Sequence, residues 1–183
     1  MVFLMHMINC ELFMKFKTII LDRDGVINFV RKNYVKSIDE LEFIPGSIKA
    51  INMLLSHFNV VVASNQAGIG KGIFGEKELC DIETDINSKL ERNIEFYYCK
   101  HQIQDNCNCR KPEPGMLLEI KLKYPGPYLF IGDNKTDFWA AKNAKVDFYF
   151  VKTGYGDKHH HLVPNENLVF ENLESLTKWV LGR

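Results

Sequence analysis

The chain has 183 residues, of which 46% are hydrophobic and 25% are charged, as in an ordinary globular protein with one well-buried core. Its 23 Lys and Arg residues balance its 23 Asp and Glu residues, so no basic field favours nucleic acid as a partner. No apolar run approaches the length of a membrane span, and the N-terminus lacks the basic lead-in and cleavage site of a signal peptide. We expect a monomer in which residues 1–16 are an extension and residues 17–183 form a single domain.

Short apolar runs alternate along the chain with segments of helical periodicity. Strands are predicted at 18–21, 59–63, 95–98, 128–131 and 147–151. Helices are predicted at 47–57, 76–92, 114–123, 136–143 and 173–181. The polar segment 29–43 is predicted to be an irregular loop over the edge of the sheet. This alternation predicts an α/β fold with a parallel sheet and helices on both of its faces.

Asp22 and Asp24 directly follow the first predicted strand, and Gly25 supplies a turn after them. Two carboxylates spaced i, i+2 at a strand end point the same way, and they repel each other unless a metal ion or a proton neutralises them. A nucleophile and a general acid beside Mg²⁺ is the arrangement that moves a phosphoryl group. A solvated turn rich in Asp and Gly is the alternative, and the pair alone does not decide between the two.

Polar groups also follow other predicted strands, where ligands bind in open α/β sheets. The second strand leads into Ser64 and a glycine-rich loop, which suit phosphate oxygens, although such a loop alone is more often only flexible. Lys111 precedes a helix and is either a cation for a phosphoryl group or a surface residue. Asp133 follows the fourth strand and either completes a Mg²⁺ site or favours a helix N-terminus.

Taken together and in order, these groups and the pattern Gly-Asp133-x-x-x-Asp resemble the haloacid dehalogenase superfamily of phosphohydrolases over about residues 17–154. The resemblance implies a Rossmann-like sheet and Mg²⁺-dependent catalysis through an aspartyl-phosphate. It assigns Asp22 as the nucleophile, Asp24 as the general acid/base, and Ser64 and Lys111 as the groups that hold the phosphoryl group. It assigns Mg²⁺ to Asp22, the backbone carbonyl of Asp24, and Asp133.

A second motif lies within eleven positions and contains Cys99, His101, Cys107 and Cys109. Three thiolates and one imidazole form a closed tetrahedral set for a structural Zn²⁺, whereas the alternative is a polar loop with free cysteines. The chain has five cysteines, an odd number that favours metal binding in a reducing compartment over a disulfide framework, so we expect the protein in the cytoplasm.

Two motifs resemble those of the heptose 1,7-bisphosphate phosphatases and the related histidinol-phosphate phosphatases. They are the zinc motif followed by Arg-Lys-Pro, and the run Leu-Asp-Arg-Asp-Gly-Val-Ile-Asn. Both groups are small and largely capless. The run Lys111-Pro-Glu-Pro-Gly-Met favours the heptose group, whereas the short interval from His101 to Cys107 is closer to the histidinol-phosphate group. We expect removal of the 7-phosphate of D-glycero-D-manno-heptose 1,7-bisphosphate. Histidinol phosphate as substrate and a non-catalytic zinc-loop binding module are the alternatives.

The expected partner is therefore a small phosphorylated sugar. Arg110 contacts substrate by the same resemblance. Arg31 and Lys32 on the loop after the first strand suit a remote phosphate, and are equally well explained as solvated loop cations. The complete set of predicted substrate-binding residues is Arg31, Lys32, Asn65, Gln66, Arg110 and Asn134.

Overall fold

The computed structural model of the protein describes residues 15–162 and 168–182. Most of the expected N-terminal extension, residues 1–14, therefore lies outside the described residues. Phe16, which we had placed in the extension, is only 3% exposed, and its ring packs edge-to-face against that of Tyr149. Phe16 therefore packs as part of the domain.

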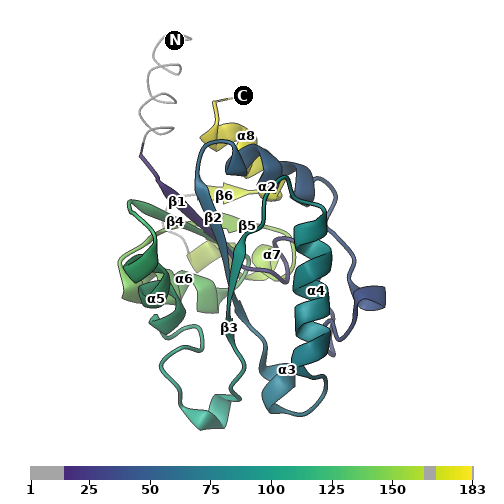
Figure 1. Cartoon of the computed structure of the whole chain (residues 1–183). Coiled ribbons are helices and arrows are strands. Elements are labelled where there is room, and N and C mark those ends of the chain that lie inside the picture. The colour runs from purple at the N-terminus through teal and green to yellow at the C-terminus, as the bar shows by residue number, and fades with distance from the viewer. Residues whose placement is uncertain (1–14, 163–167, 183) are drawn as a thin grey trace.

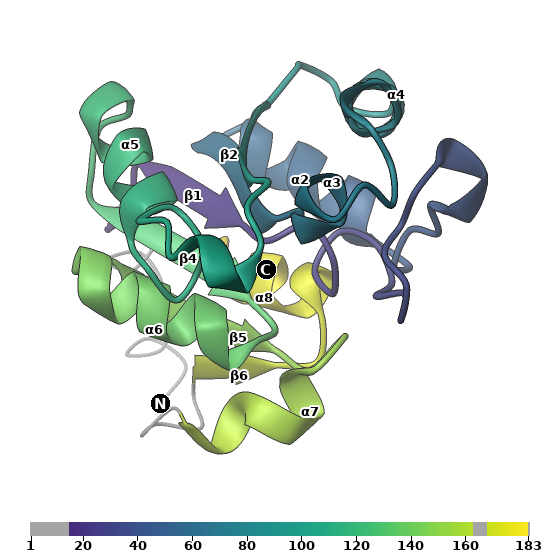
Figure 2. The same ribbon diagram turned by 90° about the horizontal axis from the view of Figure 1, so that it is seen from below.

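Six parallel strands form one sheet in the order β3-β2-β1-β4-β5-β6 (Figures 1 and 2). The strands are β1 (Thr18–Leu21), β2 (Asn59–Asn65), β3 (Glu95–Cys99), β4 (Tyr128–Gly132), β5 (Asp147–Val151) and β6 (Val169–Phe170). The order places β1 between β2 and β4, so the carboxyl ends of these three strands are neighbours. Polar residues that follow them converge on one edge of the sheet.

The α-helices are α2 (Ser47–Leu55), α3 (Ala67–Gly70), α4 (Glu76–Ser88), α5 (Gly115–Lys123), α6 (Lys135–Ala144), α7 (Gly156–His159) and α8 (Leu173–Val180). Short 3-10 helices occur at η1 (Ile38–Glu40), η2 (Ile103–Asp105) and η3 (His160–Leu162). Within the described residues, no helix has the length and apolar character needed to cross a membrane.

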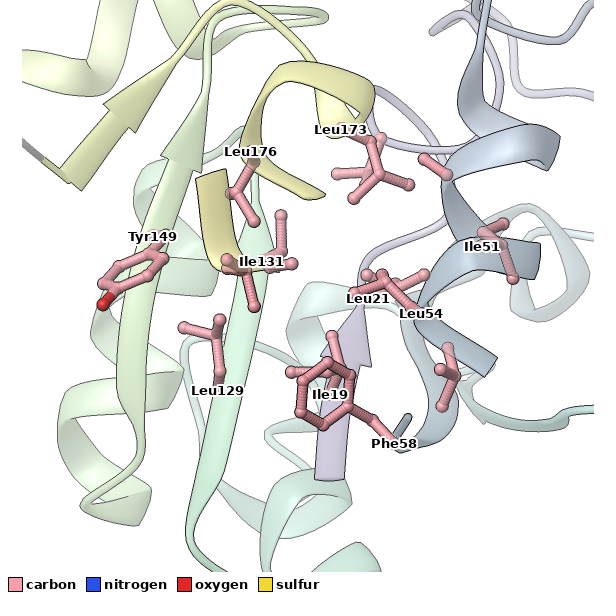
Figure 3. Packing of buried hydrophobic residues seen from close by; sticks show 14 of the residues in the cluster. Ile19, Leu21, Ile51, Leu54, Phe58, Leu129, Ile131, Tyr149, Leu173 and Leu176 are labelled. Atoms are coloured by element: carbon pink, nitrogen blue, oxygen red, sulfur yellow. The ribbon is translucent and has the colours of Figure 1, made fainter. Parts of the chain in front are cut away.

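Alternation along β1 divides the core into two layers. Ile19 and Leu21 point to the face that α2 and α8 cover, where Figure 3 shows them beside Ile51 and Leu54. Ile20 points to the other face and packs with residues of α5 and α6. Helices therefore cover both faces, and the strand ends that carry polar residues are held by fully buried apolar neighbours.

The predicted α/β class and all five predicted strands are confirmed to within two residues. The short elements β6, α3 and α7 were not predicted. The connection from β1 to α2 holds only η1, and the connection from β3 to α5 holds only η2, so the capless arrangement is also confirmed.

The loops after β1 and β5 meet at Asp133. Gly25 (φ +91°) and Gly154 (φ +62°) both adopt left-handed backbone, and a Cβ on either residue would overlap the Asp133 carboxylate. A Cβ on Gly154 would also lie 2.8 Å from Cα of Gly25. Glycine is thus required here both for its conformation and for close approach. Gly72 has a similar φ of +66°, but nothing lies within 4 Å of its missing Cβ.

We therefore expect Gly154→Ala to destabilise the fold more than Gly72→Ala. Left-handed backbone alone costs a non-glycine residue about 1–2 kcal/mol, which both variants share. Only Gly154→Ala adds the overlap with Asp133. Urea unfolding measures the two free energies, and equal losses would contradict this packing of the loops around Asp133.

Candidate active site

A cavity of about 340 Å³ lies at the carboxyl ends of β1, β2 and β4. Ten of the eleven residues predicted for catalysis, substrate and Mg²⁺ line it, namely Asp22, Asp24, Arg31, Lys32, Ser64, Asn65, Arg110, Lys111, Asp133 and Asn134. The eleventh, Gln66, is 1% exposed and is not part of the cavity wall. The structure thus brings together residues that are more than 100 positions apart in the sequence.

A buried cluster of opposite charges forms the floor of this cavity. Lys111 Nζ lies 3.0 Å from Asp22 Oδ1 and 2.6 Å from Asp137 Oδ1, and the Lys111 side chain is 1% exposed. Its Nζ also donates to the backbone carbonyl of Ala63 at 2.9 Å. Burial would lower the pKa of Lys111, but the carboxylates of Asp137 and Asp22 outweigh it and raise that pKa, so the ammonium keeps its charge.

Asp22, Asp133 and Asp137 carry more negative charge than Lys111 can balance. One oxygen from each of the three carboxylates lies within 4.8 Å of the others. Burial raises the pKa of Asp22 to about 6 and the pKa of Asp133 well above its ordinary value, and the neighbouring carboxylates add to both effects. An all-oxygen set with surplus negative charge matches the chemistry of a Mg²⁺ site.

Asp137 was part of the Gly-Asp133-x-x-x-Asp pattern, but the sequence analysis gave it no role. It is completely buried at the start of α6, where its Oδ2 accepts a hydrogen bond from the Asn134 backbone at 3.0 Å. Its other oxygen contacts Lys111. The four-residue spacing from Asp133 was the available signal, because it returns a side chain at the first turn of a helix to the strand end.

The second aspartate of the motif has an environment opposite to that of Asp22. Asp24 accepts hydrogen bonds from Asn28 Nδ2 and Gln66 Nε2, both at 2.8 Å, and its carboxylate contacts Arg23 Nη2. Burial would raise the pKa of Asp24, but the Arg23 charge and the donated hydrogen bonds outweigh it and lower that pKa. The two carboxyls of the motif thus have pKa values shifted in opposite directions, so their surroundings alone distinguish them.

Several predicted substrate contacts have structural partners as well. Asn65 exchanges two hydrogen bonds, each 3.0 Å long, with the backbone N–H and carbonyl of Lys111, which fixes the loop that carries this lysine to the end of β2. The side chain of Asn134 accepts a hydrogen bond from the Thr136 backbone and caps α6. Both residues still line the cavity.

Three cationic side chains lie at the mouth of the cavity. Arg31 is exposed and its Nε donates to the Glu40 carbonyl at 2.6 Å, and Lys32 beside it is exposed. Arg110 lies on the loop between β3 and α5 and also lines the cavity, and its Nη1 lies 3.4 Å from the carbonyl of His101. These cations face an anionic floor across the cavity, an arrangement that can hold a ligand with a second negative group at a distance from the first.

The four predicted zinc ligands also converge. Neighbouring ligand atoms lie 3.3–3.7 Å apart, and these atoms are Cys99 Sγ, His101 Nδ1, Cys107 Sγ and Cys109 Sγ. A Zn²⁺ with tetrahedral S₃N ligands needs ligand–ligand distances of about 3.5–3.8 Å. Burial raises the pKa of Cys99 to about 12, so a bound cation is needed to hold this thiol deprotonated. The cluster therefore fits Zn²⁺ and directly precedes Arg110 and Lys111.

Comparisons with known proteins agree on one family. Residues 108–176 match a family model described as HAD-hydrolase-like. D-glycero-beta-D-manno-heptose-1,7-bisphosphate 7-phosphatase of Neisseria meningitidis is 35% identical, covering 90% of this chain and 95% of that protein. D-glycero-alpha-D-manno-heptose-1,7-bisphosphate 7-phosphatase of Campylobacter jejuni is 38% identical, covering 73% of this chain and 80% of that protein.

A solved structure gives the same result for the fold. The crystal structure of D,D-heptose 1,7-bisphosphate phosphatase from B. bronchiseptica, complexed with magnesium and phosphate, matches with a TM-score of 0.83 and 34% identity. The match covers 91% of this chain and 98% of that chain. The protein belongs to the heptose-1,7-bisphosphate phosphatase family of the haloacid dehalogenase-like hydrolases.

Proposed function

We propose that this protein hydrolyses the 7-phosphate of D-glycero-D-manno-heptose 1,7-bisphosphate with the help of Mg²⁺. The observation that carries the proposal is the buried cluster in which Asp22 and Lys111 meet at 3.0 Å on the floor of a cavity rimmed by cations. Relatives that span nearly the whole chain are named for this activity. A non-catalytic zinc-loop module would have no need for such a costly buried charge cluster.

Mg²⁺ would be held by Asp22, Asp133 and the backbone carbonyl of Asp24, and when bound it would offset the negative charge of the phosphoryl group. Asp137 would act on Lys111 by fixing the position of its ammonium, because their ion pair is the shorter of the two that Lys111 makes. The oxygen chemistry of the site and the magnesium in the related crystal structure support this assignment.

In the first proposed step, a carboxylate oxygen of Asp22 attacks phosphorus, and the bond to the sugar oxygen breaks as Asp24 gives that oxygen a proton. Lys111 and Ser64 hold the phosphoryl oxygens during the transfer. In the second step, Asp24 takes a proton from water, whose oxygen attacks the phosphorus of the aspartyl-phosphate. Inorganic phosphate leaves, and both aspartates return to their starting states.

A bisphosphate substrate would use both regions of the cavity. One phosphate would bind on the floor beside Asp22 and Lys111, and the distal phosphate would contact Arg31, Lys32 and Arg110 at the mouth. Relatives are named for both the alpha and the beta anomer, so we propose the heptose bisphosphate without assigning the anomer. Histidinol phosphate has no second phosphate for these three cations.

We further propose that Cys99, His101, Cys107 and Cys109 bind one structural Zn²⁺. All four ligands belong to the protein, so no position remains for a reacting water. The bound ion would hold the loop that continues into Arg110 and Lys111 and so support the geometry of the active site. Thiolate ligands require a reducing compartment, which favours the cytoplasm.

We expect kcat/KM for heptose 1,7-bisphosphate, supplied as each anomer with Mg²⁺, to exceed that for histidinol phosphate by at least about 100-fold, because only the bisphosphate can use the cations at the cavity mouth.

Loss of the nucleophile in Asp22→Asn should lower turnover at least about 10³-fold, while the exposed control Asp39→Asn should retain it. Phosphate release measures both effects.

A larger specificity constant for histidinol phosphate would overturn the proposed substrate and keep the proposed chemistry. Turnover by a verified Asp22→Asn protein without deamidation would overturn the chemistry. Wild-type protein that releases no phosphate from either ester in the presence of Mg²⁺ would favour the non-catalytic zinc-loop module.

The zinc proposal has its own test. Protein purified without chelator should contain about one Zn²⁺ per chain. Cys107→Ser should lose most of the metal because it removes one of four ligands, whereas Cys80→Ser, which changes an exposed cysteine on α4, should retain it. Elemental analysis of the three proteins measures this. Wild-type protein without zinc, or full zinc content in Cys107→Ser, would contradict the assignment.

A further inference from the structure

Arg23 separates the two aspartates of the active site in the sequence, and its side chain is completely buried. A buried guanidinium is costly unless an anion compensates its charge. The carboxylate that contacts it belongs to Asp24, 3.0 Å from Nη2, and 27% of the Asp24 side chain is exposed. Asp24 also lines the cavity, so the buried Arg23 cation contacts a carboxylate that substrate can reach.

The short hydrogen bonds of the Arg23 side chain reach Asp24 and Gln66, and the phenol of Tyr98 also interacts with the guanidinium. Nη2 lies 3.1 Å and 3.0 Å from the two carboxylate oxygens of Asp24 and 3.2 Å from Gln66 Oε1. Among the residues that the structure describes, Nε and Nη1 have no hydrogen-bond partner. An arginine placed to join structural elements would use these donors as well, because guanidinium has five N–H groups.

Gln66 completes the contacts around Asp24. Its Nε2 donates to Asp24 Oδ2 at 2.8 Å and to Ser64 Oγ at 3.1 Å, while its Oε1 accepts from Arg23. Asn28 Nδ2 donates to the other oxygen, Asp24 Oδ1, at 2.8 Å. Each oxygen of Asp24 therefore has two donors, and one of them in each case is Arg23 Nη2. Such a set of donors fixes the orientation of a carboxylate.

We propose that Arg23 is a positioning residue for proton transfer: together with Gln66 and Asn28 it holds the Asp24 carboxyl in one orientation at the cavity. The proposal rests on the proposed function, in which Asp24 is the general acid/base. Gln66 acts in the same unit and links Asp24 to Ser64. This proposed role for Gln66 differs from the substrate contact predicted for it.

This role has a consequence for leaving groups. When Asp22 displaces a sugar alkoxide, the oxygen must take the proton of Asp24 as the phosphorus–oxygen bond breaks. When the leaving group is p-nitrophenolate, which is stable as an anion, the bond breaks without a proton. A residue that only stabilises the fold would affect both esters alike, whereas a residue that positions the proton donor affects the alkyl ester selectively.

The test compares wild-type protein with Arg23→Met and Arg23→Lys in single-turnover reactions with Mg²⁺. Heptose 1,7-bisphosphate is the alkyl ester and p-nitrophenyl phosphate is the aryl ester, and release of the alcohol or phenol is followed. Arg23→Met replaces the cation with an unbranched side chain. Arg92→Met is the matched control, because Arg92 donates to the backbone carbonyls of Leu55 and Phe58.

We expect Arg23→Met to slow alcohol release about 10–100-fold, since general acid catalysis contributes about 10²–10⁴-fold in total. Nitrophenol release should stay within about threefold of wild type, and KM for the alkyl ester should not change, because phosphate binding does not involve Arg23. Arg23→Lys should recover most of the alkyl-ester rate because its ammonium can again donate hydrogen bonds to Asp24. Arg92→Met should leave both rates unchanged.

Equal losses with both esters, no loss with either, or failure of Arg23→Lys to recover the rate would each overturn the proposal. If Arg23→Met does not fold, Gln66→Leu removes a donor to Asp24 without removing a charge, and the same selective loss is expected. Wild-type protein that releases neither leaving group would contradict the proposed function, and the role of Arg23 with it.

Discussion

The contact between the Lys111 ammonium and two buried carboxylates is the interaction on which the rest of this site depends. With 1% of its side chain exposed, Lys111 keeps its charge only because Asp22 and Asp137 lie at 3.0 Å and 2.6 Å. These carboxylates in turn could not stay ionised side by side without a cation. The surplus negative charge that remains, with Asp133 included, matches a divalent cation, which with Lys111 would offset the charge of a phosphoryl group that Asp22 accepts.

The fold brings these groups together through the order of its strands. Asp22, Ser64 and Asp133 lie at or directly after the carboxyl ends of β1, β2 and β4, which are adjacent in the sheet. Lys111 comes from a loop instead, and that loop is held by two hydrogen bonds to Asn65 and is directly preceded by the Cys/His cluster. A metal ion in that cluster would thus affect the active site by fixing the backbone of the loop that carries Lys111, without taking part in the reaction. The cavity combines three strand ends with one pinned loop.

Sequence patterns predicted the strands and the residues that follow them because parallel strands must place their carboxyl ends on one edge. They did not reveal how the side chains pair once they are there. The sequence analysis gave Arg23, between the two aspartates, no role, yet Arg23 is buried, and Gln66 is turned inward to bridge Asp24 and Ser64. Asp137 follows a recognised spacing, but its contact with Lys111 depends on a loop more than twenty residues away. The two-residue strand β6 is too short to produce an apolar pattern of its own.

Asp22 and Asp24 are chemically identical, and their surroundings alone separate them: burial beside carboxylates raises the pKa of Asp22, while Arg23, Asn28 and Gln66 lower that of Asp24. The most direct test of this division is a crystal structure of the protein with Mg²⁺ and beryllium trifluoride, a mimic of a phosphoryl group on a carboxylate. We expect beryllium on an Asp22 oxygen, with fluorine atoms in contact with Lys111 Nζ and Ser64 Oγ. Beryllium on Asp24, or only among the cations of the cavity mouth with Asp22 unmodified, would contradict Asp22 as the group that receives the phosphoryl.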